Sequence, residues 1–221
     1  MKVTAIMPTY NQGDYLDIAI ASVATQVDQL VVVDDGSTDN TPELLRAWVG
    51  LELITHSENR GTAHAINTGF EAATGDLVTW VSSDNIYASD WREILEWAFT
   101  EEADLGVAYS AFRYGIDGNI LHTMYDPDRL VHNQNCFFGP SFMIAREVWE
   151  QAGPHRGKIS HDYDHWLRVE EACWDMRRTI VSLPEVLCDY RVHDERATVQ
   201  RKDQYDADRW QIEAMERRAF C

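Results

Sequence analysis

Residues 76–87 of the 221-residue chain read Asp-Leu-Val-Thr-Trp-Val-Ser-Ser-Asp-Asn-Ile-Tyr. The first half of this stretch is a short apolar run after Gly75, as is typical of a strand buried on both faces. The second half turns polar from Ser82 onward. Ligands collect at the carboxyl ends of parallel strands, where loops meet over a rigid scaffold. Asp84 is therefore a candidate ligand for Mg²⁺ or Mn²⁺, although Ser, Asp and Asn are also typical of an ordinary turn.

The composition is strongly acidic, with 37 Asp and Glu against 19 Lys and Arg and a formal net charge of -18. This balance argues against a nucleic-acid partner and against an anionic membrane surface. A ligand that carries phosphate would then need a metal ion or local hydrogen-bond donors to offset the surrounding negative field.

The chain is long enough for one large α/β domain with a sizeable core. Its four cysteines show no C-x-x-C spacing, which indicates neither a zinc ribbon nor a disulfide framework. Residues 1–8 hold too short an apolar run for a signal-peptide core, and no run approaches the ~18 apolar residues of a membrane span. We therefore expect a cytoplasmic protein.

The first half alternates predicted strands and helices. Strands are expected at 2–7, 30–33, 51–55 and 76–81, and helices at 14–26, 62–73 and 89–99. A further helix should start after a cap at Ser37 or Asp39 and run through Trp48. This order predicts a parallel sheet with right-handed crossovers. Pro8 should end the first strand, because it has no N–H for a central ladder. No glycine-rich dinucleotide or P-loop motif occurs.

The second half is less regular. We expect a hairpin from 105–114 and 119–123, a loop at 124–134, a strand at 137–144 and a helix at 146–152. A helix from 161 or 162 to 173, two strands on either side of Pro184 and an amphipathic helix at 203–220 follow.

Polar clusters follow the four strands of the first half, at 8–10, 34–39, 59–61 and 82–85. In this order they resemble family 2 of the inverting glycosyltransferases, which have the GT-A fold. The resemblance covers roughly residues 2–195. Its most specific piece is D-D-G-S-T-D-N-T at 34–41, supported by N-R-G-T-A-H at 59–64, H-D-Y-D-H-W-L-R at 161–168 and Y-R-V-H at 190–193.

The resemblance implies an α/β fold with a Rossmann-like, mostly parallel central sheet flanked by helices and a smaller antiparallel element on the acceptor side. Residues 1–200 would form one GT-A domain, with a nucleotide-sugar half at 1–100 and an acceptor half at 101–200. Residues 201–221 would be the C-terminal amphipathic helix, through which a homo-oligomer could form.

On the donor side, the resemblance implies a set of residues that bind the nucleotide: Pro8, Thr9, Tyr10, Asp35, Arg60, Ser83 and Asp84. The divalent metal, Mn²⁺ or Mg²⁺, would bind Asp84, with His193 as a second ligand. The chain departs from the family's D-x-D element, because its leading acid falls on Ser82 or Ser83. Asp84 is then the single carboxylate there.

On the acceptor side, Asp162 lies at the family's E-D position, which makes it the expected general base. His161 replaces the usual Glu before it. Asp162 could also cap a helix, and the two roles are compatible. By analogy, Gly139, Pro140, Ser141 and Trp166 would line the acceptor cleft, with core packing as the alternative for Trp166.

The expected activity is therefore transfer of a sugar from a nucleoside-diphosphate sugar, UDP- or similar, to a hydroxyl of a glycan, a lipid-linked sugar or another acceptor. Two alternatives stay open from the sequence. One is a sugar-phosphate nucleotidyltransferase on a similar sheet, and the other is a non-catalytic nucleotide or sugar binding module.

Overall fold

The structure is a computed structural model of the chain, and it describes residues 1–115, 118–121, 138–157 and 161–193. The strands are β1 Val3–Thr9, β2 Gln29–Asp34, β3 Glu52–Thr55, β4 Leu77–Trp80, β5 Ile86–Tyr87, β6 Leu105–Tyr114, β7 Ile120–Leu121, β8 Phe142–Ala145 and β9 Thr179–Tyr190. The helices are α1 Leu16–Val23, α2 Thr41–Ala47, α3 Thr62–Ala72, α4 Trp91–Glu101, α6 Arg146–Ala152 and α7 His161–Asp175.

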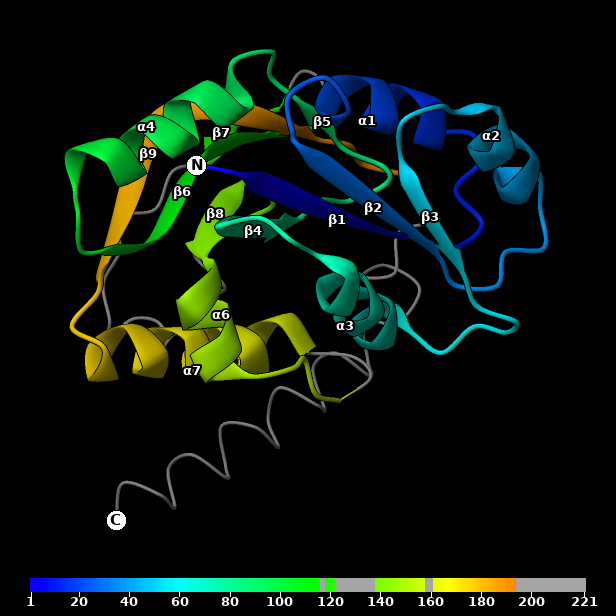
Figure 1. The fold of residues 1–221 in the computed structure, drawn as a ribbon. Coiled ribbons are helices and arrows are strands. Elements are labelled where there is room, and N and C mark those ends of the chain that lie inside the picture. The colour runs from blue at the N-terminus through cyan, green and yellow to red at the C-terminus, as the bar shows by residue number, and fades with distance from the viewer. Residues whose placement is uncertain (116–117, 122–137, 158–160, 194–221) are drawn as a thin grey trace.

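One sheet joins all the described strands, in the order β3-β2-β1-β4-β8-β6-β9-β5, with β7 paired to β6 (Figure 1). The strands β3, β2, β1 and β4 run parallel to one another. β8 is antiparallel to both β4 and β6, and the predicted hairpin of β6 and β7 is present. The predicted α/β fold, with a mostly parallel sheet and an antiparallel element in the second half, is confirmed.

The prediction that Pro8 ends the first strand is wrong, because β1 continues through Pro8 to Thr9. Successive residues of β1 form their backbone hydrogen bonds alternately on the β2 side and on the β4 side. The Thr9 carbonyl accepts from the Asp35 N–H on the β2 side, and the Ile6 carbonyl accepts from the Val81 N–H on the β4 side. Pro8 therefore faces the β4 side, where the pairing has already ended at Ile6. Its missing N–H costs no ladder bond at this position.

The two strands predicted around Pro184 form one strand, β9. Along its parallel pairing with β6, Ser110 lies opposite Leu183 and the next residue, Ala111, lies opposite Val186. The register shift leaves Pro184 in a bulge, where it needs no ladder partner. A proline thus interrupts the pairing without ending the strand.

One short strand was not predicted, and three predictions concern residues that the structure does not describe. β5 was not predicted, because two residues carry no periodic pattern, and it pairs antiparallel with β9. The predicted loop at 124–134, the helix at 203–220 and any oligomer contact through 201–221 lie outside the described residues. Within the described part of the chain, no helix is long and apolar enough to cross a membrane.

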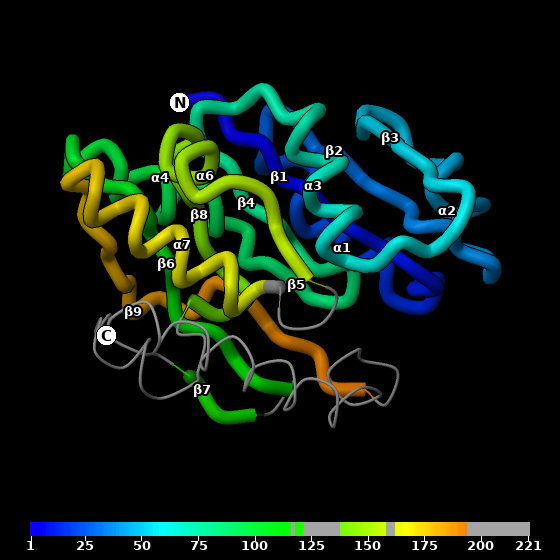
Figure 2. Tube along the Cα trace, turned by 90° about the horizontal axis from the view of Figure 1, so that it is seen from below, coloured from blue at the N-terminus to red at the C-terminus, as the bar shows by residue number. Residues whose placement is uncertain are grey.

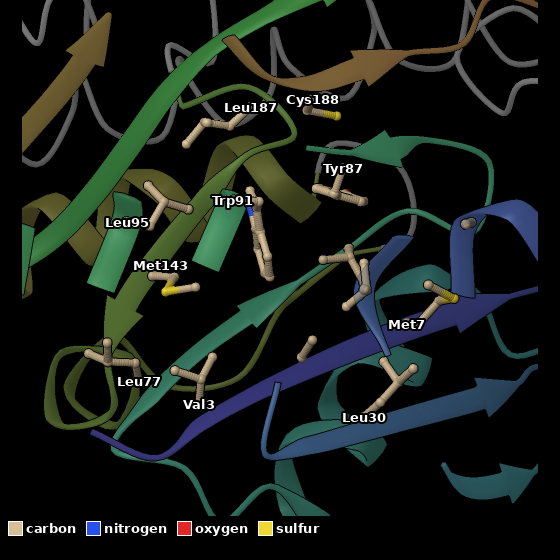
Figure 3. Close-up of a cluster of buried hydrophobic side chains, with 14 of the residues drawn as sticks. Val3, Met7, Leu30, Leu77, Tyr87, Trp91, Leu95, Met143, Leu187 and Cys188 are labelled. Atoms are coloured by element: carbon tan, nitrogen blue, oxygen red, sulfur yellow. The ribbon is translucent and has the colours of Figure 1, made fainter. Parts of the chain in front are cut away.

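Helices cover both faces of the sheet: α1, α2 and α4 lie on one face, and α3, α6 and α7 on the other (Figures 1 and 2). Figure 3 shows the first core, in which Trp91 and Leu95 of α4 lie over β1, β4 and β8 beside Val3, Leu77 and Met143. Burying each large side chain of this kind contributes about 1.5–3 kcal/mol. A second core lies on the other face, between the sheet and α3, α6 and α7. The two cores hold the sheet between its layers of helices.

Helix α3 approaches the sheet closely at Gly69. A Cβ built on Gly69 would lie 2.3 Å from Cγ2 of Ile6, which is fully buried in β1. We expect Gly69→Ala to lower the free energy of unfolding by about 1–3 kcal/mol, because overpacking outweighs the better helix propensity of Ala. Urea unfolding midpoints measure the change. The exposed Glu71→Ala on the same helix should stay within about 0.5 kcal/mol, and equal midpoints for both variants would contradict the close approach.

Candidate active site

The loops that follow β1 and β2 are bonded to each other at the carboxyl edge of the sheet. The Asn11 N–H donates to Ser37 Oγ at 2.9 Å, and the Thr38 N–H donates to Asn11 Oδ1 at 2.8 Å. Asp39 accepts from the N–H groups of Gly13 and Thr41. Burial raises the pKa of Asp39, and these hydrogen bonds outweigh burial and bring that pKa below its usual value. Side chains thus supply the hydrogen-bond acceptors for backbone N–H groups in these two loops.

Asp35 follows β2 and connects it to the loop before α3. Its carboxylate accepts from the Arg60 N–H at 3.0 and 3.1 Å and from the Gly61 N–H at 2.7 Å. His56 Nδ1 lies 2.7 Å from Asp35 Oδ1. The Asp35 residue is 3% exposed, so these contacts fix a buried carboxylate at the strand ends.

Other residues predicted to bind the nucleotide lie at the end of β1 and in the loop before α3. Pro8 and Thr9 end β1, and Tyr10 directly after them is 40% exposed. The Arg60 residue is exposed and bonds Asp35 through its backbone. Both Tyr10 and Arg60 therefore present side chains to solvent at this edge.

Asp84 and His193, the two predicted metal ligands, lie next to each other. His193 Nε2 is 3.1 Å from Asp84 Oδ2, although the residues are 109 positions apart. The His193 ring also stacks on Tyr15, with ring centroids 4.2 Å apart and planes at 24°. The segment after β9 thus reaches the loop after β4 and the start of α1.

Arg191 holds this segment in place. Its Nη2 donates to the Tyr15 carbonyl at 2.9 Å, its Nε donates to the Asp84 carbonyl, and its backbone N–H donates to Asn85 Oδ1 at 3.2 Å. Burial lowers the pKa of Arg191, and the nearby Asp84 offsets part of this effect. The guanidinium carbon lies 5.1 Å from the centre of the Tyr15 ring.

The Asp84 and His193 pair is chemically suited to a divalent cation, since carboxylate oxygen and imidazole nitrogen are both ligands of such ions. Within the part of the chain that the structure describes, no group of three or more His, Cys, Asp or Glu side chains could hold a metal. A cation at Asp84 would therefore take its remaining ligands from water or from substrate oxygens.

Tyr87 ties the loop after β4 to the segment before β8. Its hydroxyl accepts from the Ser82 N–H at 3.0 Å and donates to the Pro140 carbonyl at 3.2 Å. Burial raises the pKa of Tyr87 well above its usual value, so the phenol stays protonated and able to donate. Ser83, predicted to contact the nucleotide, is 6% exposed in the same loop.

The predicted acceptor residues are largely buried. Ser141 is fully buried, and its Oγ lies 2.6 Å from Ser110 Oγ. Trp166 is 1% exposed and stacks on Phe138 at 3.8 Å between ring centroids. Gly139 has φ +56°, and a Cβ there would meet the Phe112 ring at 2.7 Å. Trp166 thus packs in the core, and the acceptor roles of these residues stay predictions.

Asp162 lies in the first turn of α7, where its Oδ1 accepts from the Tyr163 N–H at 2.9 Å. The next turn of α7 carries Trp166, whose ring centroid is 5.3 Å from that of Trp80 at the carboxyl end of β4. Asp162 therefore begins a helix that packs against the strand leading to Asp84. This bond to the next residue is not the bond to the N2 or N3 N–H that a helix cap makes, and the role of Asp162 as general base stays a prediction.

Sequence reasoning missed three residues that organise this edge: His56, Tyr87 and Arg191. His56 comes directly after β3, as the predicted site residues come after their strands, and this position was a usable signal. Tyr87 and Arg191 act through contacts with distant segments, which no local pattern reports.

The mostly parallel sheet with polar loops at its carboxyl edge is an arrangement shared with solved glycosyltransferases of the GT-A fold. The structure of TarS from Staphylococcus aureus in complex with UDP-GlcNAc is similar over 89% of this chain and 60% of that chain, with a TM-score of 0.71 and 19% identity. The mannosyltransferase PcManGT from Pyrobaculum calidifontis in complex with GDP-Man and Mn²⁺ has a TM-score of 0.70 and 24% identity, over 92% of this chain and 60% of that one.

The model of Glycosyl transferase family 2 matches residues 4–179, and the chain belongs to this family. The relative "Glycosyltransferase GlyG" of Streptococcus pneumoniae is 35% identical over 186 residues, which are 72% of this chain and 62% of GlyG. The chain thus spans about three fifths of the length of GlyG and of the two solved chains, of which the TarS chain comprises residues 1–349. The family predicted from the sequence is confirmed.

The Tyr87 bridge gives a stability prediction. We expect Tyr87→Phe to lower the free energy of unfolding by about 1–3 kcal/mol, because the Ser82 N–H and the Pro140 carbonyl both lose their partner. Urea unfolding measures the change, and the exposed Tyr10→Phe should unfold like the wild type. An unchanged midpoint for Tyr87→Phe would show that the bridge contributes nothing to stability.

Proposed function

We propose that the chain transfers a sugar from a nucleoside-diphosphate sugar to an acceptor hydroxyl, with inversion at the anomeric carbon. The observation that carries the proposal is the pairing of Asp84 with His193 at 3.1 Å, at the edge where the other strand-end loops meet. Family membership supports the reaction class. TarS and PcManGT, two similar structures, were solved with bound nucleotide sugars.

The first half of the chain, residues 1–100, would hold the donor. The exposed Tyr10 ring is placed to pack against a base, and the exposed Arg60 guanidinium is placed to meet a diphosphate. Asp84 and His193 would hold Mn²⁺ or Mg²⁺, which when bound neutralises negative charge on the diphosphate.

The second half, residues 101–200, would bind the acceptor, and Asp162 would act as its general base. As the acceptor oxygen attacks the anomeric carbon, its proton passes to the Asp162 carboxylate. The bond from the anomeric carbon to the diphosphate oxygen breaks, and the nucleoside diphosphate leaves from the opposite face. This displacement inverts the anomeric configuration. We include a cytoplasmic location in the proposal, because the spacing of the four cysteines is not that of a disulfide framework.

A non-catalytic binding module is the second candidate, favoured by Ser82 or Ser83 at the position of the family's leading acid and by His161 in place of the usual Glu. The Ser82 N–H already donates to the Tyr87 hydroxyl, and Asp84 is the single carboxylate among residues 82–85. Binding of nucleotide sugars by the wild type, without release of nucleoside diphosphate in the presence of any sugar acceptor, would select this function.

The donor site is tested by thermal unfolding of the wild type with UDP, GDP and their sugars, with and without MnCl₂. We expect a higher Tm with ligand and a further rise with Mn²⁺, since a ligand that binds the folded state stabilises it by mass action. Asp84→Ala should lose the Mn²⁺-dependent part of the shift. The exposed Asp90→Ala, six residues on, should keep it. A full Mn²⁺ response in Asp84→Ala would remove Asp84 from the metal site.

The general base is tested with Asp162→Asn. This variant should bind the nucleotide sugar as the wild type does, while release of nucleoside diphosphate with a panel of sugar acceptors falls about 10²- to 10⁴-fold. Asp164→Asn is the matched control, because Asp164 lies on the same helix and pairs with Arg168 instead. Wild-type transfer rates in Asp162→Asn would exclude this role for Asp162.

A further inference from the structure

Asn67 of α3 holds the backbone of His155, which lies 88 positions later in the chain. The Asn67 Nδ2 donates to the His155 carbonyl at 2.9 Å, and the His155 N–H donates to Asn67 Oδ1 at 2.8 Å. A backbone N–H only donates and a carbonyl only accepts, so the two bonds together fix which way the Asn67 amide faces. The contact needs a side chain that offers a donor and an acceptor side by side.

The His155 ring connects strand β4 to helix α7. His155 is 4% exposed, and its ring stacks on that of His165 in α7, with centroids 3.9 Å apart and planes at 18°. The same ring meets the Trp80 ring at the end of β4, at 4.8 Å between centroids and with planes at 89°. Buried rings in such contact cannot shift relative to one another without repacking. The position of His155 therefore affects how α7 lies against β4.

Both ends of this connection lie close in sequence to an acid of the proposed reaction. His165 is three residues after Asp162 on α7, and residues three apart on a helix are neighbours on its surface. Trp80 is four residues before Asp84, which lies in the loop after β4. The two acids are thus joined through the rings of Trp80, His155 and His165.

We propose that Asn67 is a positioning residue for the transfer step. By holding the His155 backbone, it sets where α7 presents Asp162 relative to Asp84. The inference rests on the proposed function, because it takes Asp162 as the general base and Asp84 as a ligand on the donor side. A base must lie within hydrogen-bond reach of its proton, and a misplacement of about 1 Å can cost about 10²-fold in rate.

Binding of the donor should not depend on this contact. The N-terminus of α3 is held separately at the donor edge, where the Gly61 N–H donates to Asp35 at 2.7 Å. Loss of the Asn67 bonds should therefore lower the rate of transfer and leave the affinity for the nucleotide unchanged.

The first test is Asn67→Asp, which keeps an acceptor for the His155 N–H but places a carboxylate oxygen against the His155 carbonyl. Release of UDP from UDP-glucose and UDP-GlcNAc, and of GDP from GDP-mannose, is measured with a panel of sugar acceptors. We expect kcat to fall about 10- to 100-fold, while KM for the nucleotide sugar and the Kd of UDP or GDP stay within about 2-fold. Asn67→Ala, which removes both bonds, should change the same quantities in the same direction.

A double-mutant cycle separates positioning from a loss of stability. In an Asp162→Asn background, Asn67→Asp should lower kcat by less than about 2-fold more, because the base that it positions is already absent. A purely structural role would give the same fall in both backgrounds. Ala98→Gly is the stability control, since it weakens α4 on the other face of the sheet and should lower Tm without lowering kcat.

The outcomes separate this inference from the proposed function. A wild type that releases neither UDP nor GDP from these donors would overturn both, and so would a wild-type kcat in Asp162→Asn. A wild type that transfers sugar, with an unchanged kcat in Asn67→Asp or an equal fall in both backgrounds, would overturn only the role of Asn67. If Asn67→Asp does not fold, Asn67→Ala decides through the same comparisons.

Discussion

The site depends on satisfying the backbone N–H groups of the loops that follow the parallel strands. Polar side chains of a neighbouring loop accept from these N–H groups. Ser37 accepts from the Asn11 N–H and Asn11 accepts from the Thr38 N–H, which joins the loops after β1 and β2. Asp35 does the same for Arg60 and Gly61. A buried N–H without a partner costs about 1–3 kcal/mol, so each of these contacts removes a penalty as well as adding a bond. The residue types that hold these loops are also the types that can bind a polar ligand.

Most of the fold could be predicted from local patterns in the sequence. The apolar runs that became β2, β4 and β6 are continuous and bounded by glycine or polar residues, and the helix at 146–152 was predicted with its observed bounds. The errors at Pro8 and Pro184 share one cause. The rule against proline in a strand depends on whether the missing N–H would have a ladder partner. At Pro8 the neighbouring strand has stopped pairing, and at Pro184 a bulge interrupts the pairing; both are properties of the sheet.

The site could be predicted only in part. The residues that follow strands, such as Asp35 and Asp84, were identifiable because the strands themselves were. The pairing of Asp84 with His193 came from a family resemblance, and the contacts of Arg191 with Tyr15 join positions 176 apart. The burial of Trp166 also depends on tertiary packing, since Phe138 and Trp80 supply its contacts from other elements.

The strand order β3-β2-β1-β4 has a consequence for where a ligand can lie. From β1 the chain first moves outward through β2 to β3 and then returns to the opposite side of β1 to form β4, so the direction of winding reverses there. Accordingly α1 and α3 leave the sheet on opposite faces (Figure 1). Such a topological switch point separates the adjoining loops and opens a crevice above the strand ends. The connectivity of the sheet therefore sets where a ligand across β1 and β4 would lie, and substitutions in the loops leave that connectivity unchanged.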